Sequence, residues 1–203
     1  MTNKKIIKIN LGAGPDGISS WRNFDWGLLP FLAKTGLLKA IISCGFLTKD
    51  YDRLWPKFDL VDIRKGIPMN DNSVDFVYCS HVLEHFEKWE SVKVVREIRR
   101  VLKRGGLVRL VMPDVKKIVK IKDVDELCRV WWGYDKDKIR GVRSWMVRGH
   151  RWMYSADSFK QVLIQTGFSK IKFLKYRQGR VPDLDKLDLA VHKDLSFYVE
   201  VKK

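Results

Sequence analysis

An amphipathic helix between two strand-like runs constrains the fold of this chain more than any other feature. The runs are residues 73–80 (SVDFVYCS) and 107–113 (LVRLVMP). Between them, in residues 89–106, apolar side chains recur at spacings of three and four, and Gly105-Gly106 is expected to stop the helix. Strands that alternate with helices predict an α/β fold with a mostly parallel sheet, covered on both faces.

Four further runs have the Val, Ile and Phe content of strands, in residues 5–11, 58–63, 170–176 and 196–202. A second helix is predicted in residues 155–168, with Ser155 as its cap and Gly167 at its end. The last two strands are joined by residues 177–195, which show no helical pattern. These two strands can therefore pair in antiparallel fashion at one edge of the sheet.

The composition is that of a soluble, single-domain protein. The chain has 203 residues, of which 45% are hydrophobic and 32% are charged. Its first residues have only short apolar runs, so neither a signal peptide nor a membrane span is predicted there. Cys44, Cys79 and Cys128 form no CxxC pair and have apolar neighbours, which favours buried thiols in a reducing cytoplasm.

The basic charge is concentrated in one part of the chain. The formal net charge is +16, and residues 88–151 carry 19 basic and 8 acidic side chains. Such a surface can attract nucleic acid, anionic lipid or a phosphorylated substrate. Solvated faces of exposed helices account for the same pattern equally well.

Residues 26–47 are apolar almost throughout, with Lys34 and Lys39 as the only charges. Pro30, Gly36 and the two lysines interrupt the run that a transmembrane helix needs, so none is predicted. A pair of helices, buried or acting as a lid, is the preferred interpretation. Contact with a membrane surface or a protein partner is the alternative, since an exposed apolar patch usually has a use.

Gly12, Gly14 and Gly17 follow the first strand with the spacing G-x-G-x-x-G of dinucleotide sites. The context argues against a pyrophosphate. No helical periodicity follows the turn, and Pro15 removes one amide from it. Asp25 comes too early in the chain to be the ribose ligand of a dinucleotide fold. A nicotinamide-dependent dehydrogenase is therefore the least favoured function.

Five segments in register resemble the class I S-adenosylmethionine-dependent methyltransferases. They are NLGAG (10–14), WRNFD (21–25), residues 60–86 with HVLEHF, residues 97–114 with RVLKRGG, and residues 150–168. More narrowly, they are similar to a small branch found with glycan and polysaccharide biosynthesis. The resemblance implies a Rossmann-like fold, a seven-stranded mostly parallel sheet with one antiparallel strand.

The resemblance also implies which residues bind S-adenosylmethionine. The glycine turn would lie against the methionine part, an acid would take the ribose hydroxyls, and other positions would flank the adenine or face the opposite side. The residues of the glycine turn are Leu11, Gly12, Ala13 and Gly14, and the acid is Asp25. Asp62 and Ile63 would flank the adenine, and Ser80 and His81 would face the opposite side of the cofactor. The whole chain is expected to be one methyltransferase domain, and it departs from the family in an apolar insertion at about residues 26–57.

The acceptor side is expected in residues 114–153, where Trp, Arg and Lys interleave. This mixture suits a sugar carrying phosphate, or bases on a phosphate backbone. Methyl transfer needs mainly alignment, with a base for some acceptors. The candidate bases are His81 and His150, and Glu84, Trp152 and Tyr154 are placed on the acceptor side. His81 and His85 have a spacing found in zinc sites, but no third ligand is evident, so no metal is expected.

The sequence therefore predicts a cytoplasmic methyltransferase with a small-molecule, glycan or glycolipid acceptor. An RNA methyltransferase that uses the basic residues 88–151 is the first alternative. A non-catalytic adaptor that keeps the fold is the second, with residues 26–47 contacting a membrane or a protein.

Overall fold

The computed structural model describes residues 5–47, 49, 52–133 and 149–203. Their centre is a seven-stranded sheet in the order β3-β2-β1-β4-β5-β7-β6. The strands are β1 Lys8–Leu11, β2 Arg22–Asp25, β3 Phe58–Leu60, β4 Val74–Ser80, β5 Leu102–Pro113, β6 Lys170–Leu174 and β7 Ser196–Lys202. All neighbouring pairs are parallel except those made by β7, which is antiparallel to both β5 and β6. The predicted α/β sheet and its antiparallel edge are confirmed.

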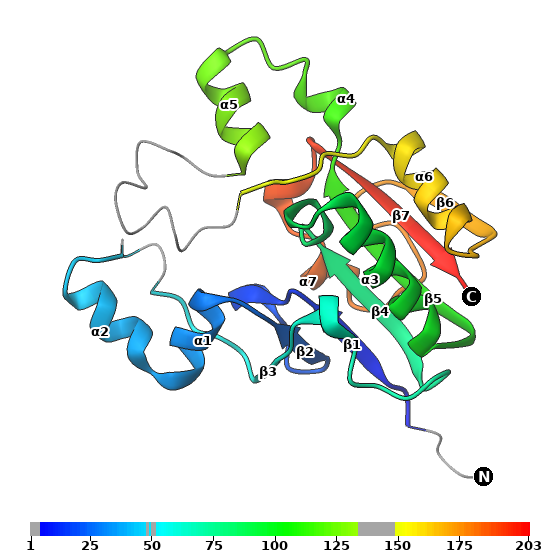
Figure 1. Ribbon diagram of the computed structural model, residues 1–203, viewed down its shortest axis with the longest axis horizontal. Coiled ribbons are helices and arrows are strands. Elements are labelled where there is room, and N and C mark those ends of the chain that lie inside the picture. The colour runs from blue at the N-terminus through cyan, green and yellow to red at the C-terminus, as the bar shows by residue number, and fades with distance from the viewer. Residues whose placement is uncertain (1–4, 48, 50–51, 134–148) are drawn as a thin grey trace.

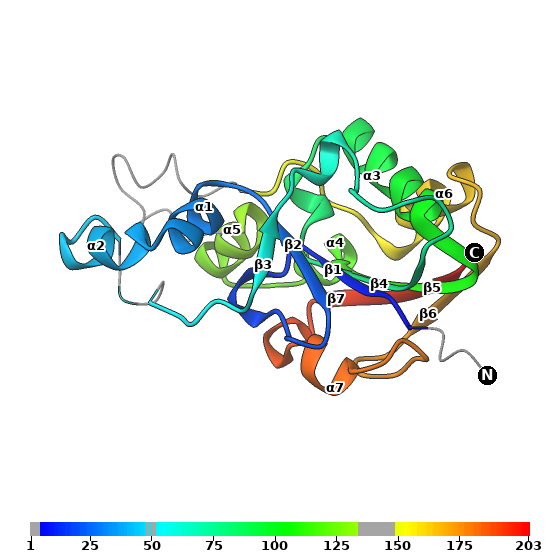
Figure 2. The same cartoon turned by 90° about the horizontal axis from the view of Figure 1, so that it is seen from below.

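Helices lie on both faces of the sheet (Figures 1 and 2). Figure 2 shows α3 (Lys88–Val101) and α6 (Ala156–Gln165) above the sheet and α7 (Leu184–Leu187) below it. Side chains of β4 alternate between the two cores, with Val77 and Cys79 on the α3 side and Tyr78 on the α7 side. This alternation follows from the two-residue period of a strand.

The predicted helix in residues 89–106 ends earlier than expected. It runs from Lys88 to Val101, and the extended strand β5 begins at the next residue, Leu102. The glycine pair lies inside a bulge instead, because Val74 pairs with Leu102 while Phe76 pairs with Leu107. Gly105, with a φ of +85°, lets the chain make this bulge. The second helix is confirmed, since Ser155 caps α6 in a capping box.

The apolar segment after β2 forms the expected helix pair, α1 (Leu28–Thr35) and α2 (Leu37–Ser43). The pair extends from the end of the sheet in both views (Figures 1 and 2). It has a small core of its own, made by Leu32, Leu38 and Leu47, so it is not buried in the main core. Large apolar side chains remain exposed on it, among them Phe31 and Leu37. No helix in the described residues is long and apolar enough to cross a membrane.

Two short helices, α4 (Val115–Ile118) and α5 (Val124–Trp132), follow β5. They form part of the expected acceptor subregion, but residues 134–148 of that subregion lie outside the described residues. The expectation of three buried thiols is wrong for two of them. Cys79 is buried in β4, whereas Cys44 and Cys128 are exposed, because each follows or belongs to a helix that lies away from the main core.

Candidate functional site

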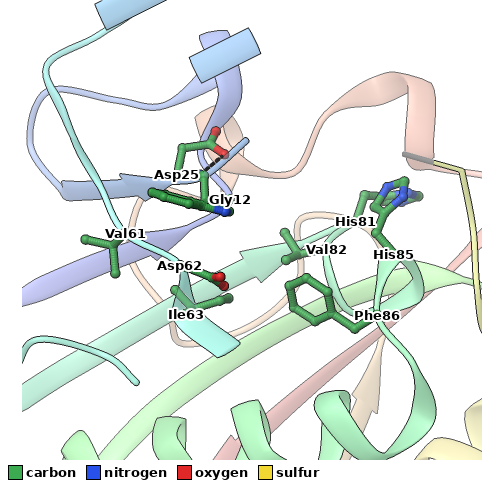
Figure 3. A pocket seen from close by; sticks show the side chains of 10 residues that line it. Gly12, Asp25, Val61, Asp62, Ile63, His81, Val82, His85 and Phe86 are labelled. Carbon is green, nitrogen blue, oxygen red and sulfur yellow. Dashed lines mark hydrogen bonds between the residues drawn. The ribbon is translucent and has the colours of Figure 1, made fainter. Parts of the chain in front are cut away.

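A cleft of about 240 Å³ opens beyond the carboxyl ends of the parallel strands (Figure 3). Open α/β sheets bind ligands at this edge, where the strand order reverses beside β1. The volume is just below the range of roughly 300–1,000 Å³ that is typical of small-molecule sites. The residues that line the cleft are Gly12, Asp25, Trp26, Val61, Asp62, Ile63, His81, Val82, His85 and Phe86.

The glycine turn forms one wall of the cleft. Gly12 has a φ of +67°, and a Cβ atom built on it would lie 2.1 Å from Cγ2 of Val82. Glycine is therefore required here for both the backbone conformation and the close approach. The neighbouring Leu11 is fully buried in the main core, and Ala13 is 7% exposed. Neither residue lines the cleft. Their expected contact with a cofactor stays a prediction.

Asp25, at the end of β2, is held by backbone groups. Its Oδ2 accepts a hydrogen bond of 2.7 Å from the N–H of Gly14, and its Oδ1 accepts one of 2.7 Å from the N–H of Trp26. Burial raises the pKa of Asp25, and the two backbone hydrogen bonds oppose that rise. The carboxylate is thus oriented at the edge of the cleft, with lone pairs left for two further donors.

Asp62 and Ile63 follow β3 and line the cleft between apolar side chains. Arg64 binds Asp62 through two hydrogen bonds of 2.8 Å, from Nε to Oδ1 and from Nη2 to Oδ2. Burial tends to raise the pKa of Asp62, but Arg64 outweighs that effect and lowers it. Ile63, Val61, Val82 and Phe86 supply apolar surface suited to a flat ring.

His81 and His85 lie at the end of the cleft opposite Asp25 (Figure 3). His81 follows β4 and has a φ of +54°, a left-handed conformation that non-glycine residues adopt mostly at turns and functional sites. Its Nε2 lies 2.9 Å from Oγ of Ser196, and its ring stacks on that of His192 at 3.6 Å. The sequence carries no sign of this stack, because His192 is remote in the chain. Burial lowers the pKa of His192 to about 4. Ser80 itself does not line the cleft.

The expected acceptor-side residues lie in three different environments. Glu84 is fully buried behind His81. Trp152 is 41% exposed and lies under the ammonium group of Lys88. Tyr154 is 1% exposed, packs against Phe159 in the main core and does not line the cleft, so its expected place on the acceptor side stays a prediction. Its strand-like pairing with Asp114 holds Tyr154 in the core.

His150 lies behind the histidine end of the cleft. Its ring is 5.0 Å from that of His85, and its Nδ1 lies 3.0 Å from the backbone oxygen of Trp131. Burial lowers the pKa of His150, partly offset by the negative charge of Glu84. His150 does not line the cleft, so its expected role as a base stays a prediction.

Trp26, Val61, Val82, His85 and Phe86 line the cleft although they were not among the expected site residues. Trp26 is the first residue of the apolar insertion, so this segment contributes to the cleft. Val61 precedes Asp62, and Val82, His85 and Phe86 lie in the HVLEHF motif. The motif was thus the available signal, but only the folded chain shows which of its side chains face the cleft.

Comparison with known proteins agrees with this geometry. Residues 43–110 match the family described as methyltransferase domain. An uncharacterised methyltransferase-like protein of Schizosaccharomyces pombe is 37% identical over 94 residues, which is 41% of this chain and 36% of that protein. An uncharacterised protein of Methanocaldococcus jannaschii is 29% identical over 111 residues, 46% of this chain and 48% of its own length. The chain thus spans about a third to a half of these relatives.

Solved structures show the same fold. A possible histamine N-methyltransferase of Thermotoga maritima superposes with a TM-score of 0.55 at 12% identity, covering 100% of this chain and 84% of that one. A methyltransferase of Archaeoglobus fulgidus gives 0.55 at 11% identity, covering 98% and 87%. Both are described as S-adenosylmethionine-dependent. The fold is therefore that of the Rossmann-like methyltransferases, and the matched segment and the fold together support a methyltransferase.

Proposed function

We propose that this protein is a methyltransferase that uses S-adenosylmethionine. The observation that carries the proposal is the cleft itself, with Gly12 and Asp25 at one end and His81 at the other. The resemblance of the sequence motifs implies a cofactor role for these same three residues. When bound, the cofactor supplies a methyl group already activated on a sulfonium sulfur.

The residues of the cleft fit such a ligand. Oriented by Gly14 and Trp26, the carboxylate of Asp25 can accept both hydroxyl protons of a ribose. Ile63, Val61 and Phe86 provide apolar contact for a purine. The bare backbone at Gly12 lets a ligand approach closely, and nothing lies within 4 Å of a Cβ built on Gly14.

For the transfer itself, the chain has to bind both substrates in line and exclude water. The histidine end of the cleft is the part that can meet an acceptor. His81, with Ser196 and Glu84 beside its two ring nitrogens, is the residue that we propose takes a proton from an acceptor hydroxyl or amine. His150 can serve only if the acceptor reaches behind His85.

A glycan or glycolipid precursor is the acceptor class that we propose, and it rests on the similarity of the five motifs alone. An RNA acceptor is the alternative, supported by the net charge of residues 88–151. Several of these basic side chains are already engaged within the protein: Arg100 with Glu97 and Asp71, Lys103 with Asp75, and Arg109 with Asp188. Fewer basic side chains of residues 88–151 are therefore free to contact RNA phosphates than the sequence alone suggests.

Calorimetric titration tests the proposed function directly. S-adenosylhomocysteine, the demethylated product, and NAD would be titrated in parallel into the full-length protein. We expect binding of S-adenosylhomocysteine and no heat with NAD. Binding of NAD in preference, or no binding of S-adenosylhomocysteine at millimolar concentration, would refute the proposal and favour an adaptor that keeps only the fold. Retention on RNA that weakens steeply with salt would instead assign the acceptor to RNA.

A further inference from the structure

Glu84 is a carboxylate with no exposed surface, located directly after β4 in the 3-10 helix Leu83–His85. Among the described residues, neither of its oxygens has a hydrogen-bond partner. The nearest approach is that of Nδ1 of His81, 3.2 Å from Oε1, without hydrogen-bond geometry. The ring of His81 is an ion-pair partner of Glu84, but a fully buried carboxylate whose oxygens accept no hydrogen bond is still costly, and such a group in a native protein calls for a further ligand.

Two histidines complete a cluster around this carboxylate. Ligand atoms of Glu84, His85 and His150 all lie within 4.8 Å of one another. The backbone brings His150 here, because the N–H groups of Arg151 and Trp152 both donate to the carbonyl oxygen of Glu84, at 2.7 and 3.1 Å. Backbone hydrogen bonds thus hold the segment that contains His150 beside Glu84, although the two are far apart in the chain.

The hydrogen bonds of the two rings determine their tautomers. Nδ1 of His85 lies 3.2 Å from the backbone oxygen of Gly149, and Nδ1 of His150 lies 3.0 Å from that of Trp131. A carbonyl oxygen only accepts, so each Nδ1 carries the proton and each Nε2 keeps its lone pair. Metal-binding histidines are usually held in this way by a backbone or carboxylate oxygen.

The space for His150 depends on a glycine. Gly133 ends α5 with a φ of +72°, and a Cβ atom built on it would lie 2.5 Å from Nε2 of His150. Any other residue at this position would displace the ring. The end of α5 is therefore shaped to admit the imidazole.

We propose that Glu84, His85 and His150 bind one divalent transition-metal ion of the zinc type. Two imidazoles and a carboxylate are a ligand set of catalytic zinc sites, which leave one position open for water or substrate. Imidazole ligands disfavour Mg²⁺ and Ca²⁺, which prefer oxygen. Zinc bonds of about 2.0–2.2 Å hold any two ligand atoms within roughly 4.4 Å of each other, which is close to the upper limit of 4.8 Å on the spacing of these three side chains.

The position of this site gives it a use in the proposed function. His85 lines the cleft at the end opposite Asp25, where an acceptor would meet the cofactor. A metal ion there binds an oxygen atom of the acceptor at its open position, orients it and lowers the pKa of its hydroxyl. Metal binding itself does not depend on whether the protein transfers methyl groups.

Calorimetry with Zn²⁺ on the full-length protein, freed of metal by a chelator, tests the site. We expect one equivalent to bind, Mg²⁺ to give no heat, and Co²⁺ to produce the visible absorption of a low-coordinate site. Glu84→Gln, close in shape to the native residue, should weaken Zn²⁺ binding at least tenfold. His150→Ala is the second variant, so that misfolding of the first leaves the test intact.

Two control variants separate this site from others. His192→Gln removes a histidine that is not one of the three proposed ligands, and Cys128→Ser removes an exposed thiol. Both variants should bind Zn²⁺ as the wild type does. The proposal is overturned if Zn²⁺ does not bind, if folded Glu84→Gln and His150→Ala bind it unchanged, or if Cys128→Ser abolishes binding. Titration of S-adenosylhomocysteine into the same metal-free protein reports on the proposed function separately.

Discussion

The carboxylate of Asp25 is joined to the glycine turn by a hydrogen bond, since its Oδ2 lies 2.7 Å from the backbone nitrogen of Gly14. The bond links the ends of β1 and β2, which are neighbours in the sheet. It fixes the acid beside the bare backbone of the turn. The position of the carboxylate and the conformation of the glycine turn, which together would hold a nucleoside, therefore depend on each other.

Replacing Asp25 should affect ligand binding strongly. We expect Asp25→Ala to weaken the binding of S-adenosylhomocysteine by about 1.5–3 kcal/mol, the scale of hydrogen bonds to a charged group. Calorimetric titration measures the change. Asp59→Ala is the matched control, because Asp59 lies on the adjacent strand β3 and pairs with Arg22 outside the cleft. Unchanged affinity in Asp25→Ala would mean that the ribose lies elsewhere.

The pH dependence of binding follows from the raised pKa of Asp25. Ribose hydroxyls need the ionised carboxylate as acceptor, so affinity for S-adenosylhomocysteine should fall as the pH falls through that raised pKa. The stability of the unliganded protein should change in the opposite direction. A pKa higher in the folded than in the unfolded state contributes stability that is lost as the pH rises through the folded value. Titrations and denaturant unfolding over the acid range measure both, with Asp25→Ala as the reference for each.

Gly12→Ala should destabilise the protein for two separable reasons. A positive φ costs a non-glycine residue about 1–2 kcal/mol, and the new methyl group would also collide with Val82. Gly14→Ala is the control, since it has a φ of +55° but nothing within 4 Å of the added atom. In urea unfolding, the free energy of unfolding should be lower for Gly12→Ala than for Gly14→Ala. In the double variant Gly12→Ala with Val82→Ala, the excess cost should diminish; additive losses would contradict the close contact.

The ion pair of Arg109 and Asp188 should be a large determinant of stability. Both side chains have no exposed surface, Nη2 and Oδ2 lie 2.7 Å apart, and Arg109 also donates to the carbonyl oxygens of Gln178 and Lys175. Asp188→Ala leaves a buried guanidinium without its charge partner and should cost about 3–5 kcal/mol in unfolding free energy.

The exposed pair of Arg22 and Asp59 provides the comparison for this measurement. Asp59→Ala should cost no more than about 1 kcal/mol, because the pair is solvated. Replacing both buried partners, as Arg109→Met with Asp188→Leu, should recover part of the loss by removing both charges. Equal costs for Asp188→Ala and Asp59→Ala would show that water reaches the buried pair.

Local patterns in the sequence were sufficient for most of the sheet. Strand composition and the spacing of apolar residues located β1, β3, β4, β5, β6 and β7 within a few residues. The lack of a helical pattern in residues 177–195 indicated the antiparallel edge, although the short helix α7 lies in that segment. The end of α3 was predicted too far along the chain, because the sequence does not show that β5 begins at Leu102, before the glycine pair. Turn residues can mark a bulge as well as a helix end.

The site was predictable to the extent that its residues follow strand ends. Asp25 ends β2, Asp62 comes two residues after β3, and His81 directly follows β4. Parallel strands bring these ends to one edge of the sheet. The acidic and histidine residues behind that edge were harder to interpret. Tyr154 looked like an acceptor-side group, yet the chain folds it into the core beside Phe159.

What the sequence alone determined is therefore the layer structure and the edge of the sheet at which a ligand binds, since both follow from short-range periodicity. What only the tertiary structure decided is which distant side chains meet: His192 on His81, and His150 beside His85 and Glu84. These contacts are made by loops and by backbone hydrogen bonds between segments far apart in the chain. No periodic pattern in the sequence indicates contacts of this kind, so they can be identified only in the folded structure.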